Sequence, residues 1–203
     1  MAETVSHGNR RHHKGTHMGP ADHVLLEKCA NGDRQASALL INRHSPRVLS
    51  IAQRMLGSRE DAEDVTQDVF IKVFQTAANW VQKDAKFTTW LHRVTVNQCY
   101  DRLRKKRETI LEEPPEQEDE SLGPAGQLLA QQRQKRLKAA IDELPERQRA
   151  ALLLSHYEEM SNTETAEILD ISVEAVESLL SRARRTLRTA LAAERNSLMG
   201  KVE

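Results

Sequence analysis

Four side chains near the C-terminus can read DNA if they share one face of a helix. At the helical spacing i, i+3, i+4 and i+7 they are Ser178, Ser181, Arg182 and Arg185. A guanidinium group can pair with the edge of guanine in the major groove, and a serine hydroxyl can bind a base or a phosphate. The same spacing puts Arg184 and Arg188 beside this face, within reach of phosphates. The alternative is a plain solvated basic face, and the pattern favours DNA reading.

The elements that would present this face form a predicted helix-turn-helix. Ser161 and Glu164 have the S-x-x-E spacing of a capping box and begin a short helix. Residues 170–172 predict a tight turn. After the turn an apolar stripe predicts a longer helix, with a core formed by Val176, Leu180, Ala183, Leu187 and Leu191. A short helix, a tight turn and a longer basic helix, in this order, are typical of a DNA-binding motif.

Three carboxylates in the first half of the chain fall on one polar helix face. They are Asp61, Asp64 and Asp68, at i, i+3 and i+7. Like charges at helical spacing repel each other by about a few tenths of a kcal/mol per pair, and a basic partner would relieve this repulsion. Taken alone, the pattern favours a solvated acidic face, with a basic partner as the alternative.

Aromatic residues are concentrated in one segment. Six of the seven lie between Phe70 and Tyr100, next to a basic run that ends at Arg107. An aromatic ring can stack on an unpaired base at about 1–3 kcal/mol per base while cations hold the backbone. We expect Phe70, Phe74 and Trp90 to belong to the core. Base contact and packing are equally open for Trp80 and Phe87.

Residues that end or begin helices recur between 21 and 107. Asn31-Gly32-Asp33 predicts the end of one helix and the cap of the next, and Leu56-Gly57 followed by Ser58 predicts another boundary. Ser45-Pro46 predicts a further helix start, because proline suits the first position of a helix. Helical spacing resumes from Phe87 to Arg107 after a break at residues 79–86. We therefore expect the N-terminal part to be all-α.

Composition indicates two small helical domains. The 203 residues include 30 basic and 30 acidic side chains, and 38% are hydrophobic. Glycine and proline are few, which favours helix over sheet. Residues 108–120 carry seven acids and no Lys or Arg, which predicts a flexible acidic linker. We expect an all-α fold with a disordered tail at 1–20, an N-terminal domain at 21–107, a linker at 108–127, a C-terminal helix-turn-helix domain at 128–196 and a tail at 197–203.

Several classes of protein are not indicated. The chain has no run of about 18 apolar residues and no secretory signal at its start, so we expect a cytoplasmic protein without membrane insertion. It has no phosphate-binding loop, dinucleotide-binding fingerprint, metalloprotease motif or nucleophile elbow, so we expect neither an enzyme nor a cofactor. The histidines of the first twenty residues are irregularly spaced and do not predict a metal site.

Four stretches together resemble the extracytoplasmic-function group of bacterial sigma factors, which are two-domain promoter-specificity subunits of RNA polymerase. In chain order they are NGDRQASALLINRH, LGSREDAEDVTQDVFIKVF, KFTTWLHRVTVNQCYDRLRKK and LPERQRAALLLSHYEEMSNTETAEILDISVEAVESLLSRARRTLR. The resemblance covers nearly all of residues 22–195. It implies a protein that binds core polymerase, recognises a two-part promoter and promotes DNA opening.

The resemblance also implies roles for particular residues. The face that docks on the polymerase clamp would comprise Asp61, Asp64, Gln67 and Asp68. The surface that captures a flipped base of the minus-ten element and holds its backbone would comprise Trp80, Lys86, Phe87, Thr88, Arg93, Asn97, Asp101, Arg102, Arg104 and Lys105. The minus-thirty-five surface would comprise Ser178, Ser181, Arg182, Arg184, Arg185 and Arg188. Glu177 and Leu179 depart from the family, where these positions are frequently basic.

The expected partners are core RNA polymerase, promoter DNA and an anti-sigma factor that separates or occludes the two domains. The acidic linker resembles the family segment that runs toward the polymerase active site. A stand-alone helix-turn-helix regulator is the alternative function, and it would need its own dimer interface to read two half-sites. The acidic face and the aromatic loop argue against it.

Overall fold

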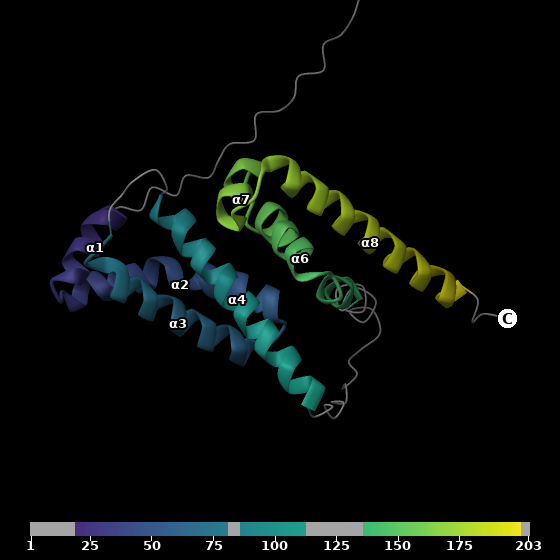
Figure 1. Cartoon of the computed structure of the whole chain (residues 1–203), viewed down its shortest axis with the longest axis horizontal. Coiled ribbons are helices and arrows are strands. Elements are labelled where there is room, and N and C mark those ends of the chain that lie inside the picture. The colour runs from purple at the N-terminus through teal and green to yellow at the C-terminus, as the bar shows by residue number, and fades with distance from the viewer. Residues whose placement is uncertain (1–18, 81–85, 113–135, 200–203) are drawn as a thin grey trace, which may run out of the picture.

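The protein is built from helices in two groups. The computed structural model describes residues 19–80, 86–112 and 136–199. The first group contains α1 (Asp22–Ala30), α2 (Arg34–Leu56), α3 (Arg59–Ala77) and α4 (Phe87–Glu112). The second contains a helix at residues 136–142, α6 (Glu146–Leu152), a π-helical turn (Leu153–Tyr157), α7 (Asn162–Leu169) and α8 (Val173–Met199). The described ranges contain no strand, which confirms the all-α prediction (Figure 1).

Capping interactions are present at several of the predicted helix boundaries. Asp33 accepts hydrogen bonds from the backbone N–H groups of Gln35 and Ala36 at the start of α2. Gly57 ends this helix with a φ of 71°, a left-handed conformation that costs glycine little because it has no Cβ. Ser58 then caps α3 by accepting from the N–H of Asp61. Both halves of the capping box at the start of α7 are present.

The predicted helix start at Ser45-Pro46 is wrong. Pro46 lies inside α2, which continues without interruption from Arg34 to Leu56. A proline inside a helix costs about 3 kcal/mol, because it removes one hydrogen bond and crowds the preceding turn. The helix buries Leu40 before the proline and Val48 and Ile51 after it. Each such side chain contributes about 1.5–3 kcal/mol when fully buried, so packing of both halves against the neighbouring helices outweighs the local cost.

Helix α4 extends beyond the predicted end of the N-terminal domain. It runs to Glu112, past Arg107 and into the acidic segment expected to be a linker. The rest of the predicted linker, residues 113–127, lies outside the described residues, as do the first residues of the predicted C-terminal domain, 128–135, and most of the two expected tails. The linker and domain boundaries stay predictions.

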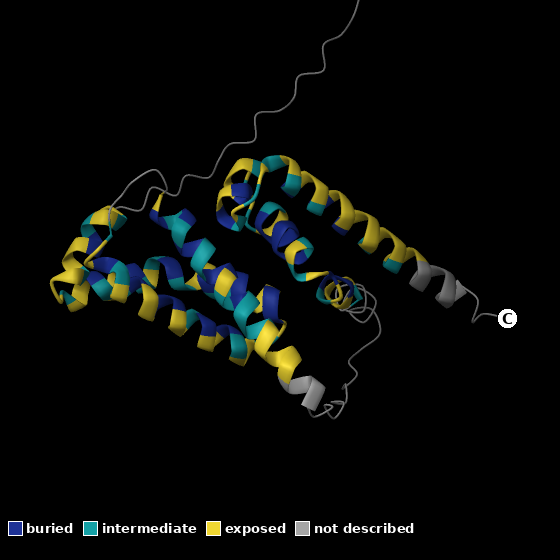
Figure 2. Ribbon diagram, in the orientation of Figure 1, coloured by how far each residue is buried: buried dark blue, intermediate teal, exposed yellow. Residues whose placement is uncertain are grey.

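The two helical groups share hydrophobic core. One cluster joins buried residues of α1 to α4 with Ala150, Leu153, Leu154 and Ile168 of the second group. Two smaller clusters hold α6, α7 and α8 together, with Val176, Leu180 and Ala183 of α8 buried. Leu191 was predicted to extend this stripe, but it is 38% exposed because α8 projects beyond the body of the protein (Figures 1 and 2).

No helix in the described ranges is long and apolar enough to cross a membrane. Within the same ranges, His, Cys, Asp and Glu side chains form no group of three or more that could hold a metal ion.

Candidate nucleic-acid interface

The basic face of α8 is open to solvent. Every member of the predicted minus-thirty-five set is exposed, and α8 is exposed along most of its outer side (Figure 2). Four of the six line a shallow hollow of about 250 Å³: Ser181, Arg184, Arg185 and Arg188. The core stripe on the opposite side packs on α6 and α7, so the helix-turn-helix presents this face outward.

Two acidic residues lie near the start of this helix. Hydrogen bonding to its own backbone and to Ser172 lowers the pKa of Glu174. Glu177 accepts a hydrogen bond from Asn162 Nδ2 of α7 at 3.4 Å. Its carboxylate is therefore held at the junction of the two motif helices, beside the predicted DNA-reading face.

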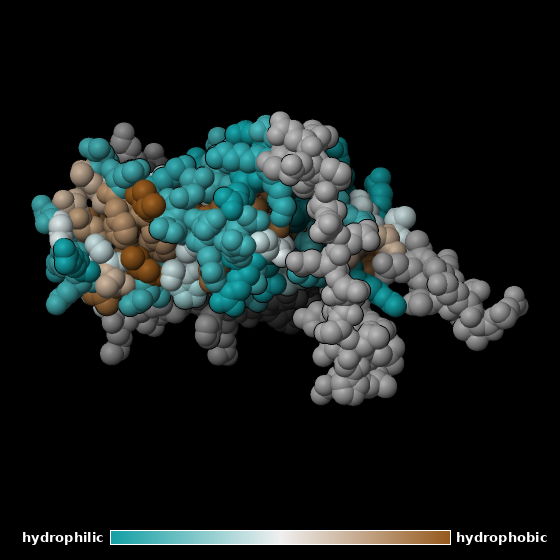
Figure 3. Space-filling view, turned by 90° about the horizontal axis from the view of Figure 1, so that it is seen from below, coloured by the Kyte–Doolittle hydropathy of each residue, from teal (hydrophilic) through white to brown (hydrophobic). Residues whose placement is uncertain are grey.

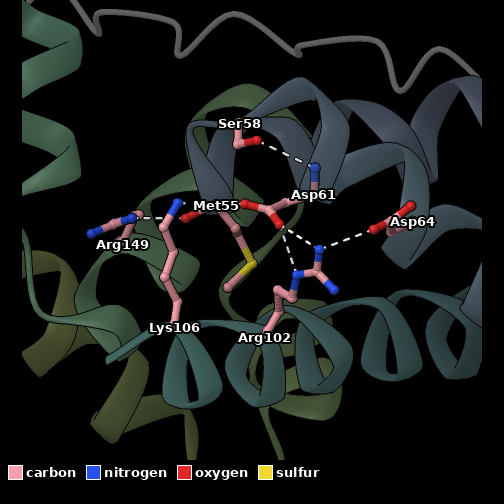
Figure 4. A network of polar contacts seen from close by, with 7 residues as sticks. All are labelled: Met55, Ser58, Asp61, Asp64, Arg102, Lys106 and Arg149. Atoms are coloured by element: carbon pink, nitrogen blue, oxygen red, sulfur yellow. Dashed lines mark hydrogen bonds and ion pairs between the residues drawn. The ribbon is translucent and has the colours of Figure 1, made fainter. Parts of the chain in front are cut away.

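The predicted acidic face occupies one side of α3. Asp64, Gln67 and Asp68 are exposed, whereas Asp61 is half-buried. Asp61 and Asp64 both bind the guanidinium of Arg102 on α4 (Figure 4). Burial alone raises the pKa of Asp61, but hydrogen bonding to Arg102 and the charges of Arg102 and Lys106 outweigh it and hold the pKa below its usual value.

An apolar groove beside this face was not predicted from the sequence. It has a volume of about 630 Å³ and runs between α2 and α3, where Gln67 borders Phe70, Ile71 and Phe74. Ile71 is 45% exposed. Hydrophobic surface gathers at the end of the molecule formed by the first helices (Figure 3). The sequence signal was Ile71 itself, an apolar residue at helical spacing from Gln67 and Asp68 on a polar face.

The two aromatic residues left open by the sequence occupy different environments. Phe87 is 6% exposed, and its ring lies 5.4 Å from His44 and 5.6 Å from Trp80 in edge-on geometry. Packing against neighbouring rings in the core therefore explains the position of Phe87. Trp80 is half-buried against Trp90 at 5.0 Å, and its indole Nε1 is buried without a hydrogen-bond partner in the described residues.

A hollow of about 270 Å³ lies beside these rings. Four of the residues that line it belong to the predicted minus-ten set: Trp80, Lys86, Phe87 and Thr88. The other two, Asp22 and His23, come from α1. The two α1 residues were missed by the sequence analysis, because no short-range spacing links residues 22–23 to residues 80–88. Asp22 is tied to α2 by Arg43 Nη1 at 2.7 Å.

Helix α4 carries the other predicted minus-ten residues on different sides. Asn97, Arg104 and Lys105 are exposed. Arg104 binds Asp101 on its own helix at 2.9 Å. Arg93 instead faces the second helical group: it donates a hydrogen bond to the carbonyl of Glu167, and its Nη2 lies 3.7 Å from Asp170 Oδ1 in the turn of the helix-turn-helix. The structure therefore brings together only part of the predicted set.

Arginines join the two groups at further points. Arg47 of α2 binds Glu158, with Nε 2.7 Å from Oε2 and Nη2 2.9 Å from the carbonyl oxygen. Arg149 of α6 is buried and donates to the carbonyl of Met55 at the end of α2 at 2.7 Å, and also to the carbonyls of Asp142 and Leu144. The second group is thus held against the first by polar contacts as well as by shared core.

A buried histidine at this junction makes stability depend on pH. His92 is 4% exposed, and burial, reinforced by the charges of Arg47 and His44, lowers its pKa to about 3, with Glu164 opposing. Below about pH 6.5 an unfolded histidine is protonated whereas this one stays neutral. Stability is therefore lost as pH falls from 6.5 toward 3.

We expect His92 to cost about 2 kcal/mol of unfolding free energy between pH 7 and pH 5, a window that lies above the ordinary pKa values of Asp and Glu. Urea unfolding at the two pH values measures the loss in the wild type and in His92→Phe, with circular dichroism at pH 7 as a check of folding. An equal loss in both proteins would show that His92 is not responsible.

Comparison with protein families identifies both halves of the chain. The family described as Sigma-70 region 2 matches residues 40–109. The family described as Sigma-70, region 4 matches residues 134–187. The first range contains the acidic face and α4 as far as residue 109, and the second contains α7 and α8 as far as residue 187.

Curated relatives from several bacteria are named as RNA polymerase sigma factors. The chain is 30% identical to the ECF RNA polymerase sigma-E factor of Haemophilus influenzae, covering 84% of this chain and 95% of that protein. It is 31% identical to the sigma-E factor of Escherichia coli K12, covering 82% and 92%. It is 35% identical to the ECF sigma factor SigE of Mycolicibacterium smegmatis over 80% of this chain, but spans 65% of that longer protein.

Solved structures show the same architecture. CnrH in complex with the cytosolic domain of CnrY is similar with a TM-score of 0.63 and 26% identity, over 85% of this chain and 97% of that one. The sigma factor RpoE of Bartonella quintana, in complex with the anti-sigma factor NepR, shares the fold with a TM-score of 0.59 at 22% identity, over 75% and 94%. With both sigma-70 regions in order and full-length relatives at 30% identity or more, the chain belongs to the extracytoplasmic-function group of RNA polymerase sigma factors.

Proposed function

We propose that this sigma factor binds core RNA polymerase through α3, opens the minus-ten element with the hollow beside Trp80 and the exposed side of α4, and reads the minus-thirty-five element with α8. The observation that carries the proposal is the separation of three surfaces in one chain: an acidic face on α3, a polar and basic face on α4 and a basic helix-turn-helix face on α8. Any catalysis in transcription belongs to the polymerase, so the chain needs no cofactor, and it works in the cytoplasm beside the chromosome.

The polymerase-binding surface combines charge with an apolar groove. Asp64 and Asp68 attract basic groups, and Gln67 lies where the acidic face meets the groove of Phe70, Ile71 and Phe74. A partner helix with basic residues beside an apolar ridge fits this combination, because the apolar ridge fills the groove while its charges fix the register.

The contacts between the two helical groups imply a step before promoter binding. Arg93 is a predicted DNA contact, yet it is bound to the end of α7 and the turn that follows. Two promoter elements separated along a duplex cannot be read while α7 packs on α4. The second group must therefore move away from the first, and an anti-sigma factor that favours the packed arrangement would keep the protein inactive.

Transcription by a defined mixture tests the proposal. Purified core polymerase with the full chain, incubated on fragmented genomic DNA, should produce transcripts whose start sites share a two-part upstream sequence, whereas core polymerase alone should not. A stand-alone regulator would bind DNA in the absence of polymerase and would leave the set of start sites unchanged.

The different roles proposed for two arginines of α8 give a second test. Arg182 lies on the predicted base-reading face and Arg188 beside it, and both are exposed. Arg182→Ala should cost about 1–3 kcal/mol at one base position, whereas Arg188→Ala should weaken matched and scrambled promoters alike. Holoenzyme binding to a panel of single-base promoter variants measures both. If the two variants behave identically across the panel, Arg182 is a phosphate contact.

A further inference from the structure

Arg102 lies between the two carboxylates at the start of the acidic face (Figure 4). Its Nε donates to Asp61 Oδ1 at 2.7 Å, and its Nη2 lies 2.6 Å from the same oxygen. Nη2 also donates to Asp64 Oδ2 at 2.9 Å. The resemblance implies that Arg102 holds the DNA backbone, but its guanidinium is directed across the α3–α4 contact.

The two carboxylates differ in how firmly they are held. Asp61 is 16% exposed, receives two guanidinium contacts and has Lys106 Nζ 3.5 Å from its other oxygen. Asp64 is 52% exposed and receives one contact, from Nη2. Asp61 therefore anchors the guanidinium, and the anchored guanidinium in turn holds one oxygen of Asp64 on the open surface.

This arrangement requires the forked geometry of a guanidinium group. The planar guanidinium offers Nε and Nη donors in fixed directions, so one side chain can reach two carboxylates at once. A lysine ammonium at the same position is a point charge on a flexible stem and cannot hold both in a set geometry.

We infer that Arg102 is a positioning residue of the polymerase-binding surface: anchored by Asp61, it orients the Asp64 carboxylate toward the partner and does not serve as a DNA contact. The inference rests on the proposed role of the acidic face. An exposed aspartate that is already held in one orientation loses less side-chain entropy when a partner binds. The binding free energy is therefore more favourable than it would be for a freely rotating aspartate.

Binding of full-length variants to core polymerase tests the inference. Arg102→Ala should weaken binding about three- to tenfold, the scale expected when one side chain is no longer pre-ordered. Arg102→Lys should recover little of this loss. Arg59→Ala is the matched control, because it removes a positive charge from the first turn of α3, where Arg59 binds only Glu63 among the contacts described, and it should change affinity less than about twofold.

A double-mutant cycle separates orientation from a purely structural effect. Asp64→Asn should weaken polymerase binding in the wild-type background and should weaken it less when Arg102 is already alanine, measured where circular dichroism shows both proteins folded. Equal effects in the two backgrounds would overturn the inference. If Asp64→Asn has no effect in either background, the proposed acidic surface itself fails.

Binding of the holoenzyme to promoter DNA provides a third test of the inference. With polymerase saturated by sigma factor, affinity for a promoter mismatched across the minus-ten element should fall no more for Arg102→Ala than for Arg59→Ala. A loss confined to this DNA, with full rescue by Arg102→Lys, would make Arg102 a phosphate contact and overturn the inference.

Discussion

Replacing Asp64 and Asp68 with lysine should abolish productive binding to core polymerase. Both side chains are exposed on α3, whereas the adjacent Val65 and Val69 are buried in the core. The substitutions convert two attractions for a basic partner into repulsions, and like-charge juxtaposition in an interface costs several kcal/mol. We expect the dissociation constant to rise at least about a hundredfold, measured by titrating labelled protein with core polymerase.

The control for this prediction must reproduce the change in net charge without altering any residue of α3. Glu27→Lys with Glu143→Lys changes the charge equally at two exposed positions, on α1 and before α6. This pair should bind polymerase with close to wild-type affinity. If the Asp64/Asp68 variant binds as well as the control pair while both are folded by circular dichroism, the acidic face is not the docking surface.

Asn97→Ala should slow promoter opening while leaving the closed complex intact. Asn97 is exposed on α4, in the same polar face as Arg104. Its amide offers both donors and an acceptor to the edge of a base that has left the stack. Loss of about 1–3 kcal/mol of base recognition corresponds to opening slowed about fivefold to 150-fold. Permanganate reactivity of unpaired thymines, followed in time on a duplex promoter, measures the rate.

A mismatched promoter separates recognition from the cost of unpairing. A template already unpaired across the minus-ten element avoids an opening cost of a few kcal/mol, so it should largely rescue a variant that is defective only in opening. Trp80→Ala should be rescued in this way if its ring acts in extracting the base. Asn42→Ala, which removes an exposed amide from α2, should open both templates like the wild type. Wild-type opening by Asn97→Ala on duplex DNA would remove Asn97 from the site.

Local sequence signals determined most of the secondary structure. The caps at Asp33, Gly57, Ser58 and Ser161 are formed by side chains and backbone groups a few residues apart, so their geometry is already contained in short stretches of sequence. The exposed basic face of α8 followed from the same kind of information, because helical spacing alone separates its arginines from Val176, Leu180 and Ala183.

Contacts between distant residues were decided by the tertiary structure. The continuation of α2 through Pro46 depends on side chains buried against other helices. The local preference of proline for the start of a helix takes no account of this packing. Phe87 meets Trp90 through helical spacing on α4, but no spacing in the sequence brings it against His44 of α2. The resemblance to sigma factors implies DNA contacts for Arg93 and Arg102, but within the folded chain a charged side chain binds whichever opposite charge or carbonyl the fold places nearest. For Arg93 that is the end of α7, and for Arg102 it is the acidic start of α3.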